Sequence, residues 1–306
     1  MPEELSYTIE EVAKLLKVSK LTIYDLVKKG DLPVFRVGRQ MRVHADDLNQ
    51  YINSTREAPS APKPEPPRLL KKDSNIVISG QDLVLDILGK HIEKQSSYKP
   101  LRSYTGSLNS LVAMYNGDCD IVSLHLFDGE TGEYNLPYLK KILAGYPYIL
   151  LNVVTRKAGM YVQNGNPHQL SSWPDLEKHD IRIINREKGS GARILLDEQL
   201  SIHGISSEAL KGYQNEETSH LSVASAVFAG KADAGIGIEK AAKIVGVDFI
   251  PLITEQYDIV ILKTTENREL IDLVKGILSS KTFQSEIDSF GGYDTSSMGE
   301  TIYETF

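Results

Sequence analysis

Residues 181–200 hold the groups best suited to chemistry: a short β-branched run, the turn Gly189-Ser190-Gly191, and then a helical pattern. If Ser190 caps that helix, the backbone N–H groups of the first turn have no partner within the helix and attract anions. Arg193 in that turn and Arg186 at the end of the strand could add full positive charge. The stretch predicts an anion site at a helix start. The alternative is a capped helix with solvated arginines.

Nucleotide-binding and catalytic patterns do not fit the chain. Ile194 stands where a dinucleotide loop needs its third glycine, and no Gly-Lys-Ser/Thr follows as in a P-loop. There is no HExxH pair and no Gly-x-Ser-x-Gly elbow, and Cys119 lies in a predicted buried strand. We therefore expect no enzyme activity, no resident cofactor and no metal site.

The elements that must position the turn belong to an ordinary globular chain. Its 306 residues, 41% apolar and 25% charged, are enough for two domains or more. The single cysteine excludes an internal disulfide and a cysteine-built zinc site. The acidic, polar first residues are unlike a secretory signal, and no apolar run reaches the roughly 18 residues of a membrane span. We expect a cytoplasmic protein that does not bind membranes.

Charge is divided unevenly along the chain. Residues 1–72 hold 13 Lys and Arg against 10 Asp and Glu, whereas the rest holds 21 against 31. The first segment is therefore the candidate for binding a polyanion.

The first segment predicts two short helices and a hairpin. Thr8 and Glu11 form a capping box, Ser19 caps a second helix after a tight turn, and Gly30 ends it. Two helices joined in this way make a helix-turn-helix. Residues 35–43 alternate around a glycine turn and predict a hairpin, which a third helix follows. Inward-facing side chains are predicted at Val12, Leu15, Leu16, Ile23, Leu26, Val27, Leu48, Tyr51 and Ile52.

Two parts of this segment, TIEEVAKLLKVSKLTIY and GDLPVFRVGRQMRV, resemble the excisionase-type, MerR-like winged helix-turn-helix. The resemblance implies that residues 19–29 enter a major groove of double-stranded DNA, while the wing holds phosphates or the minor groove. The implied DNA-binding residues are Lys20, Thr22, Tyr24, Lys28, Arg36, Arg39 and Arg42. The alternative is a protein-interaction module with a solvated basic face.

Residues 55–73 contain five of the chain's 13 prolines and few large apolar side chains, which predicts an extended spacer. We therefore predict a winged helix-turn-helix domain at 1–54, a linker at 55–73, and a separate domain at 74–306.

Residues 74–306 alternate strand and helix patterns. NIVIS at 75–79 reads as a strand and Asp82 as the cap of the next helix. A helix that starts at Ser107 stops at Gly117 and leads into a strand at 120–123. Such alternation predicts an α/β fold with a mostly parallel, covered sheet, in which ligands lie beyond the carboxyl ends of strands. A weak internal repeat, in which Ala113, Gly117 and Asp120 recur as Ala226, Gly230 and Asp233, is typical of two similar lobes.

This domain resembles the periplasmic-binding-protein type II fold, in the cytoplasmic variety related to molybdate-binding proteins and found attached to helix-turn-helix heads. Two positions depart from the family pattern: Gln81 stands where histidine is expected, and Ala192 where threonine is usual. Both bear on the identity of the bound anion. The segments that carry the resemblance are LHLFDGETGEYN, VTRKAGMYVQNGNP, INREKGSGARILLDEQL, GYQNEETSHLSVASAVFAGKADAGIGIEKAA and FIPLITEQYDIVI.

The resemblance implies two lobes that close on a ligand by hinge motion: lobe one at about 74–153 and 255–306, and lobe two at about 154–254. Helix starts from both lobes would converge on a tetrahedral oxyanion. Ser107 and Ser219 are also expected to cap their helices, and His125 to position Asp128 or a crossing loop. The implied ligand-binding residues are Ser79, Gly80, Gln81, Gly106, Ser107, Arg156, Arg186, Ser190, Gly191, Arg193, Ser219, His220 and Tyr257.

Together the two domains predict a ligand-responsive transcriptional regulator. Its effector is a small oxyanion, molybdate or tungstate by the resemblance, and a homodimer on a palindromic DNA site is expected. Three alternatives stay open. The effector could be an organic molecule with a carboxylate or phosphate; the chain could be a cytoplasmic binding protein of molybdenum cofactor metabolism; or it could be an excisionase-like architectural protein.

Overall fold

The computed structural model describes residues 6–38, 40–54, 75–178 and 180–306. The chain divides into two compact units, Met1–Lys63 and Pro64–Phe306, each with its own apolar core. The predicted linker and Arg39 lie outside the described residues. The domain boundaries at 54 and 73 therefore stay predictions.

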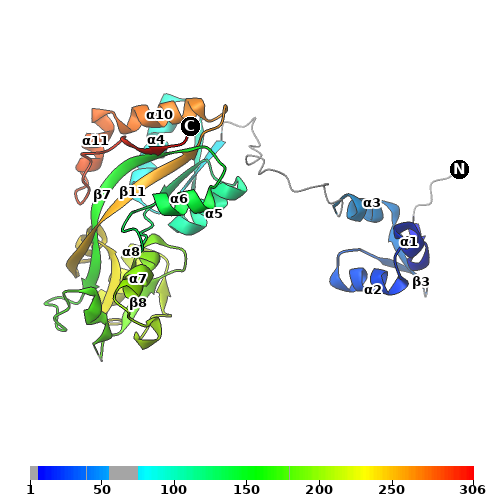
Figure 1. The fold of residues 1–306 in the computed structure, drawn as a ribbon, viewed down its shortest axis with the longest axis horizontal. Coiled ribbons are helices and arrows are strands. Elements are labelled where there is room, and N and C mark those ends of the chain that lie inside the picture. Colours follow the sequence, from blue (N-terminus) through cyan, green and yellow to red (C-terminus); the bar gives the residue numbers. More distant parts are fainter. Residues whose placement is uncertain (1–5, 39, 55–74, 179) are drawn as a thin grey trace. The chain divides into compact units, whose positions relative to one another are not determined.

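The first unit is a helix-turn-helix with a small antiparallel sheet (Figure 1). Thr8 and Glu11 form the predicted capping box, and Ser19 caps the second helix by accepting from the Thr22 N–H. Gly30 ends that helix in the left-handed conformation, with a φ of 83°. The elements are β1 (Ser6–Thr8), α1 (Ile9–Leu16), α2 (Lys20–Lys29), β2 (Phe35–Val37), β3 (Gln40–His44) and α3 (Ala45–Ser54).

The core of this unit follows most of the predicted apolar pattern. Val12, Ile23 and Leu48 are buried, but Leu15 is 57% exposed, so its predicted inward position is wrong. The strand β1, which the sequence did not indicate, pairs with β3 and adds a third strand to the predicted hairpin. The side chain of Ile52 lies outside the described part of the chain.

The second unit is built on one nine-stranded sheet in the order β5-β4-β6-β11-β7-β10-β8-β9, with β12 paired to β7. Pairs such as β4 with β5 and β10 with β8 are parallel, but β7 and β11 pair antiparallel with each other and with their neighbours. The sheet is therefore mixed rather than mostly parallel, because the two longest strands run in opposite directions. The strands are β4 (Asn75–Ser79), β5 (Lys99–Ser103), β6 (Ile121–Leu124), β7 (Tyr148–Val162), β8 (Ile183–Arg186), β9 (Glu216–Glu217), β10 (Ala234–Ile238), β11 (Asp248–Leu262) and β12 (Thr301–Glu304).

Helices pack on both faces of this sheet in each lobe. In lobe one, α4, α10 and α11 share one core, which contains Leu85, while α5 and α6 share another, which contains Leu111. In lobe two, α7 packs around Leu195, and α8 and α9 pack around Val223. The helices are α4 (Leu83–Gln95), α5 (Ser107–Asn116), α6 (Leu136–Ile142), α7 (Gly191–Ile202), α8 (His220–Phe228), α9 (Glu239–Val245), α10 (Arg268–Leu278) and α11 (Lys281–Asp288).

The strands β7 and β11 connect the two lobes (Figure 1). Each is 15 residues long, and each runs from the sheet of one lobe into that of the other. Their register shifts between Tyr257 and Asp258 and again between Pro251 and Ile253. The predicted lobe boundaries fall inside these two strands. Any movement of the lobes on a ligand between them must therefore bend or twist this pair of strands.

Asp258 lies at the first of these register shifts, where it is fully buried. Its carboxylate accepts hydrogen bonds from the side-chain amides of Asn135 (2.8 Å) and Asn152 (2.9 Å). Burial raises the pKa of Asp258 to about 6, although both amides act to lower it. The folded state therefore holds this proton more tightly than the unfolded chain does.

Asp258→Asn is expected to gain about 1–3 kcal/mol of stability over the wild type between pH 4 and pH 8, because it removes a buried charge that the wild type carries only at the higher pH. The variant also places an NH2 group where one oxygen accepted an amide N–H, and this cost is the same at both pH values. The raised pKa means that wild-type stability falls as pH rises from about 4 to 6, so the gain should develop over this range. Urea unfolding at the two pH values measures it. Asp272→Asn, which makes the same charge change at an exposed position of α10, should show no such pH dependence. An equal difference from the wild type at both pH values would contradict this account.

Candidate ligand site between the two lobes

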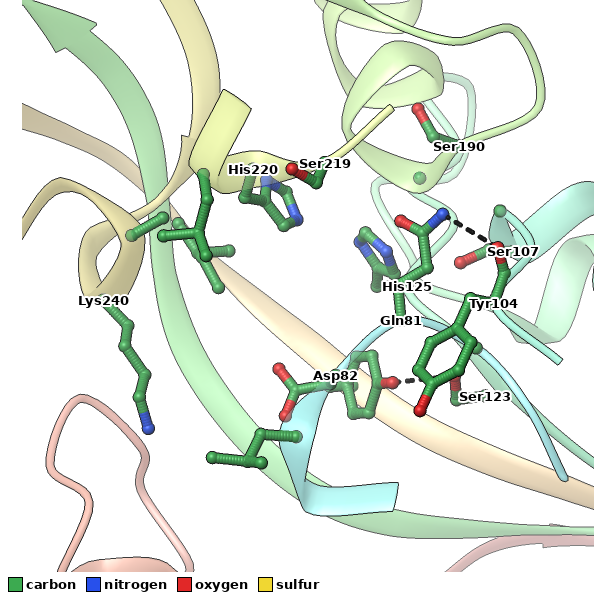
Figure 2. A pocket seen from close by; sticks show the side chains of 18 of the residues that line it. Gln81, Asp82, Tyr104, Ser107, Ser123, His125, Ser190, Ser219, His220 and Lys240 are labelled. Carbon is green, nitrogen blue, oxygen red and sulfur yellow. Dashed lines mark hydrogen bonds between the residues drawn. The ribbon is translucent and has the colours of Figure 1, made fainter. Parts of the chain in front are cut away.

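A cavity of about 730 Å³ lies between the lobes, at the starts of α4, α5, α7, α8 and α9 (Figure 2). It brings together ten of the thirteen ligand residues predicted from the sequence. Ser79, Arg186 and Arg193 do not line it. The ten are Gly80, Gln81, Gly106, Ser107, Arg156, Ser190, Gly191, Ser219, His220 and Tyr257.

The starts of α5 and α7 come from different lobes and lie against each other on one side of this cavity. Gly106 is the N-cap of α5, so Ser107 is the first helical residue and not the cap that the sequence indicated. Ser190 caps α7 as predicted, by accepting from the Arg193 N–H at 3.3 Å. Among the residues that the structure describes, none accepts a hydrogen bond from the backbone N–H groups of Ser107 and Gly191, and the Ser107 hydroxyl also lacks a partner. These groups are free to bind an anion.

Two histidines stand beside these helix starts, with ring centroids 6.3 Å apart. The Nδ1 atom of His220 is buried without a hydrogen-bond partner in the described structure. Burial, with Arg186 and Arg156 nearby, lowers the pKa of His220 well below its ordinary value, so the ring is neutral near pH 7. Ser219 caps α8 as predicted, through its bonds with Ser222, so its hydroxyl is occupied by its own helix.

His125 lines the cavity and lies beside the crossing strand β11 and not beside Asp128, the other of its two predicted positions. Its Nδ1 is 3.1 Å from the Glu255 carboxylate, although the two groups are not aligned for a hydrogen bond. Asp128 instead binds Thr131. The His125 ring packs on Gly191, where a Cβ would lie 2.5 Å from it. Only glycine leaves room for this contact.

A buried charge network forms one wall of the cavity. Arg156 on β7 binds Asp82 and, through Nε at 2.7 Å, Glu255, its neighbour on β11. Burial would raise the pKa of Glu255, but Arg156 and His125 lower it to about 2, so it is ionised. The guanidinium also lies 4.4 Å from the ring centroid of Tyr257. Arg156 is therefore neutralised by the protein itself. The sequence had predicted that its charge would be free to bind a ligand, and this is not the case.

Four other predicted contacts are already satisfied within the protein. The Ser79 hydroxyl binds those of Thr105 and Ser110, and the Tyr257 hydroxyl donates to Ser123 at 2.7 Å. The Arg193 guanidinium binds Asp197, Glu216 and the carbonyl of Arg186. Arg186 binds Glu187, Gln81 and the carbonyl of Thr218. Two of these partners are local, because Glu187 follows Arg186 directly and Asp197 stands four residues after Arg193 on the same helix. The others are distant in sequence, and no local pattern reveals them.

The lobes are held together by direct contacts at the edge of the cavity. Gln81 of lobe one accepts from Arg186 (2.6 Å) and donates to Glu187 (3.1 Å). The Leu108 N–H donates to the carbonyl of Gly189 at 3.0 Å. The structure is therefore that of a closed cleft.

Lys240, at the start of α9, also lines the cavity and was not among the predicted residues. It follows the buried strand β10, and the ends of such strands are where ligand residues gather in α/β folds. That position was the one signal in the sequence that could have identified it.

In the first unit, most of the predicted DNA-binding residues are exposed. Tyr24 is 45% exposed, Lys28 and Arg36 are exposed, and Lys20 pairs with Glu10 at 3.0 Å on the surface. The exposed Thr22 hydroxyl contacts Ser19. Arg42 differs, because its guanidinium binds the side chain and the carbonyl of Ser6 and thus ties β1 to β3. Arg39 lies outside the described residues.

Comparison with known proteins assigns both units. Residues 89–279 match the PBP superfamily domain, and residues 6–56 match a helix-turn-helix domain. The chain belongs to the PBP superfamily. It joins a helix-turn-helix domain at its N-terminus to a PBP-like domain. In the described parts of the chain, no helix combines the length and the apolar character needed to span a membrane.

Relatives of this PBP superfamily member include an uncharacterized protein of Bacillus subtilis (strain 168), YvgK, which is 56% identical over the whole of both chains. An uncharacterized protein of Clostridium pasteurianum, in the ferredoxin 2Fe-2S gene 5′ region, is 41% identical over 36% of this chain and 99% of its own.

Solved structures support the fold. A substrate-binding protein from Clostridium perfringens, solved with bound phosphate, matches 72% of this chain and 98% of its own with a TM-score of 0.53 and 14% identity. The Corynebacterium glutamicum OxyR C206S mutant matches 92% of this chain and 89% of its own with a TM-score of 0.51 and 11% identity.

Proposed function

We propose that the chain is a ligand-responsive, DNA-binding transcriptional regulator whose PBP-like unit binds a small anion between its lobes. The observation that carries the proposal is the pair of helix starts at Ser107 and Gly191, which come from opposite lobes and direct unpartnered donors at one cavity. Because a helix-turn-helix domain lies in the same chain, anion binding could alter DNA binding.

The effector class has two candidates. Molybdate and tungstate follow from the family resemblance, and the free donors of Ser107 and Gly191 suit a compact oxyanion. An organic anion is favoured by the cavity volume of about 730 Å³. A tetrahedral oxyanion fills on the order of 100 Å³, if each heavy atom takes somewhat less than the roughly 30 Å³ of a water molecule. Cavities of the observed size commonly hold larger molecules.

The proposed mechanism is a shift between open and closed lobes. An anion that contacts both helix starts binds the closed form more tightly, so it can shift the equilibrium only by that preference. In a homodimer the closed form would hold two heads at a different spacing on a palindromic site. The sign of the response, activation or repression, follows from which spacing fits the DNA.

Lys28→Ala and Arg36→Ala are each expected to weaken binding to all duplex DNA sequences and to lower the slope of log affinity against log salt by about 1, because each removes a phosphate contact. Fluorescence anisotropy with labelled duplexes at several salt concentrations measures the slope. Lys243→Ala, an exposed lysine of the second unit, is the control and should leave it unchanged. Wild-type slopes in both head variants would argue against this DNA-binding face.

The proposal is tested by the affinity of the full chain for a duplex selected from a random pool, at fixed ionic strength, with and without molybdate, tungstate, sulfate or phosphate. We expect at least a fivefold change with one anion beyond the effect of sulfate. An affinity that no anion or organic acid alters, although the anion binds, would instead support the anion-binding protein of molybdenum cofactor metabolism.

A further inference from the structure

The ammonium group of Lys240 is buried in the cavity wall with no hydrogen-bond acceptor among the residues that the structure describes. It lies 4.3 Å from the ring centroid of Tyr293 and 4.9 Å from that of Phe290, so two aromatic rings cover it on one side. Cation–π contacts of this kind offset part of the cost of removing a charge from water, but they leave the three N–H donors without acceptors.

The nearest acidic side chain does not meet this need. Asp82 accepts from the Val84 N–H, from Arg156 and, through both oxygens, from the Tyr293 hydroxyl at 2.9 and 3.1 Å. Both oxygens of its carboxylate therefore already accept hydrogen bonds from other groups. Burial lowers the pKa of Lys240, and Arg156 adds to this, while Asp82 raises it only in part. Contact with a further anion would restore the ordinary preference for the charged form.

Lys240 lies on the opposite side of the cavity from Ser107 and Ser190 (Figure 2). Apolar side chains, among them Leu83, Ile238 and Ile244, line the cavity together with these polar groups. The cavity thus has free helix-start donors on one side, Lys240 on the other, and carbon-rich walls; the covered Lys240 ammonium must turn toward the cavity to meet a ligand. A single tetrahedral oxyanion at the helix starts would leave the Lys240 ammonium without an acceptor.

We propose that Lys240 forms a second anion subsite of the cavity, and that the effector is an organic molecule with two separated acidic groups. One group binds the helix starts at Ser107 and Gly191, and the other accepts hydrogen bonds from the Lys240 ammonium. The carbon skeleton between them packs against the apolar side chains of the wall. This inference rests on the proposed function for the first subsite only.

Tungstate tests the two subsites separately, because its anomalous scattering locates each bound anion in crystals of the full chain. We expect two tungstate positions in the wild type, one at the helix starts and one at Lys240, and two per chain by calorimetry. Lys240→Met keeps a long side chain to pack on Tyr293 and Phe290 and should lose the second position only. Lys243→Met is the control, because Lys243 is on the same helix but exposed and paired with Glu239. Lys240→Gln replaces the Met variant if that variant does not fold.

Each outcome decides one claim. A single position at the helix starts overturns the second subsite and leaves the proposed function standing. A single position at Lys240 overturns the proposed anion site and supports the second subsite. No bound tungstate at either place overturns both.

Dicarboxylates test whether one molecule joins the two subsites. A series of linear dicarboxylates is titrated into the full chain beside the monocarboxylates of equal carbon number. At the best length the dicarboxylate is expected to bind at least tenfold more tightly, as suits one added charge-assisted hydrogen bond. Lys240→Met should remove this preference and Lys243→Met should keep it. Equal affinities at every length in the wild type would overturn the two-ended effector.

Discussion

Gly106→Ala is expected to weaken tungstate binding by about a hundredfold and to hold the lobes apart. A Cβ at this position would lie 2.7 Å from the carbonyl oxygen of Gly189 and 2.8 Å from the Cα of Ser190, both backbone atoms of the other lobe. Overpacking of this kind costs up to about 3 kcal/mol, and it acts only when the lobes are closed. The apparent affinity falls by the same factor as the closed population.

The effect should be confined to closure, because Gly106 has a φ of −67°, which alanine adopts without strain. Gly276→Ala on α10, where a Cβ meets nothing within 4 Å, is the matched control and should bind tungstate as the wild type does. Calorimetry gives the affinities, and small-angle X-ray scattering reports the separation of the lobes. Unchanged affinity in the Gly106 variant would show that closure is not needed for binding.

Arg156→Gln is expected to lower the unfolding free energy of the second unit by about 3–5 kcal/mol at pH 7. The substitution leaves Asp82 and Glu255 as buried carboxylates without their cation, and breaking a buried pair from one side costs about this much. Because β7 and β11 both enter this network, the loss falls on the strands that join the lobes. Urea unfolding, followed through the fluorescence of the buried Trp173, measures it.

The stability loss caused by Arg156→Gln should be larger at pH 7 than at pH 4. In the wild type the pKa of Glu255 is lowered to about 2, so its contribution to stability is complete above about pH 4.5 and is lost as pH falls toward 2. In the variant only His125 is left to oppose the effect of burial on Glu255, so the pKa of Glu255 should be higher than in the wild type and the deficit should shrink between pH 7 and pH 4. Arg182→Gln, at an exposed arginine paired with Asp233, is the control and should show a far smaller loss. A deficit that does not depend on pH would contradict the charge network as its cause.

Local signals in the sequence located the framework of the site. Ser190, Ser219 and Asp82 cap the helices that they were predicted to cap, because a cap depends on residues within one turn. The family resemblance then placed these helix starts around one cleft. Ser107 failed as a cap because the preceding residue, Gly106, takes that position without any side-chain bond.

Side-chain partners could not be predicted in the same way. Arginines at 156, 186 and 193 looked like ligand contacts, but carboxylates at Glu255, Glu187 and Asp197, together with residues farther along the chain, already bind them. The pairs with Glu187 and Asp197 are local, but the contacts with Glu255, Glu216 and Gln81 form only in the folded chain. For the same reason Lys240 was missed, since only the folded chain shows that its ammonium has no acceptor among the described residues.

We expect the filling of the cavity between the lobes to be coupled to DNA binding. Calorimetric titration of the full chain with its effector anion, first alone and then saturated with selected duplex DNA, measures that coupling directly. Linkage requires the anion affinity to change by the same factor by which the anion changes DNA affinity, and we predict a factor of at least 5. Equal anion affinities with and without DNA would contradict the account.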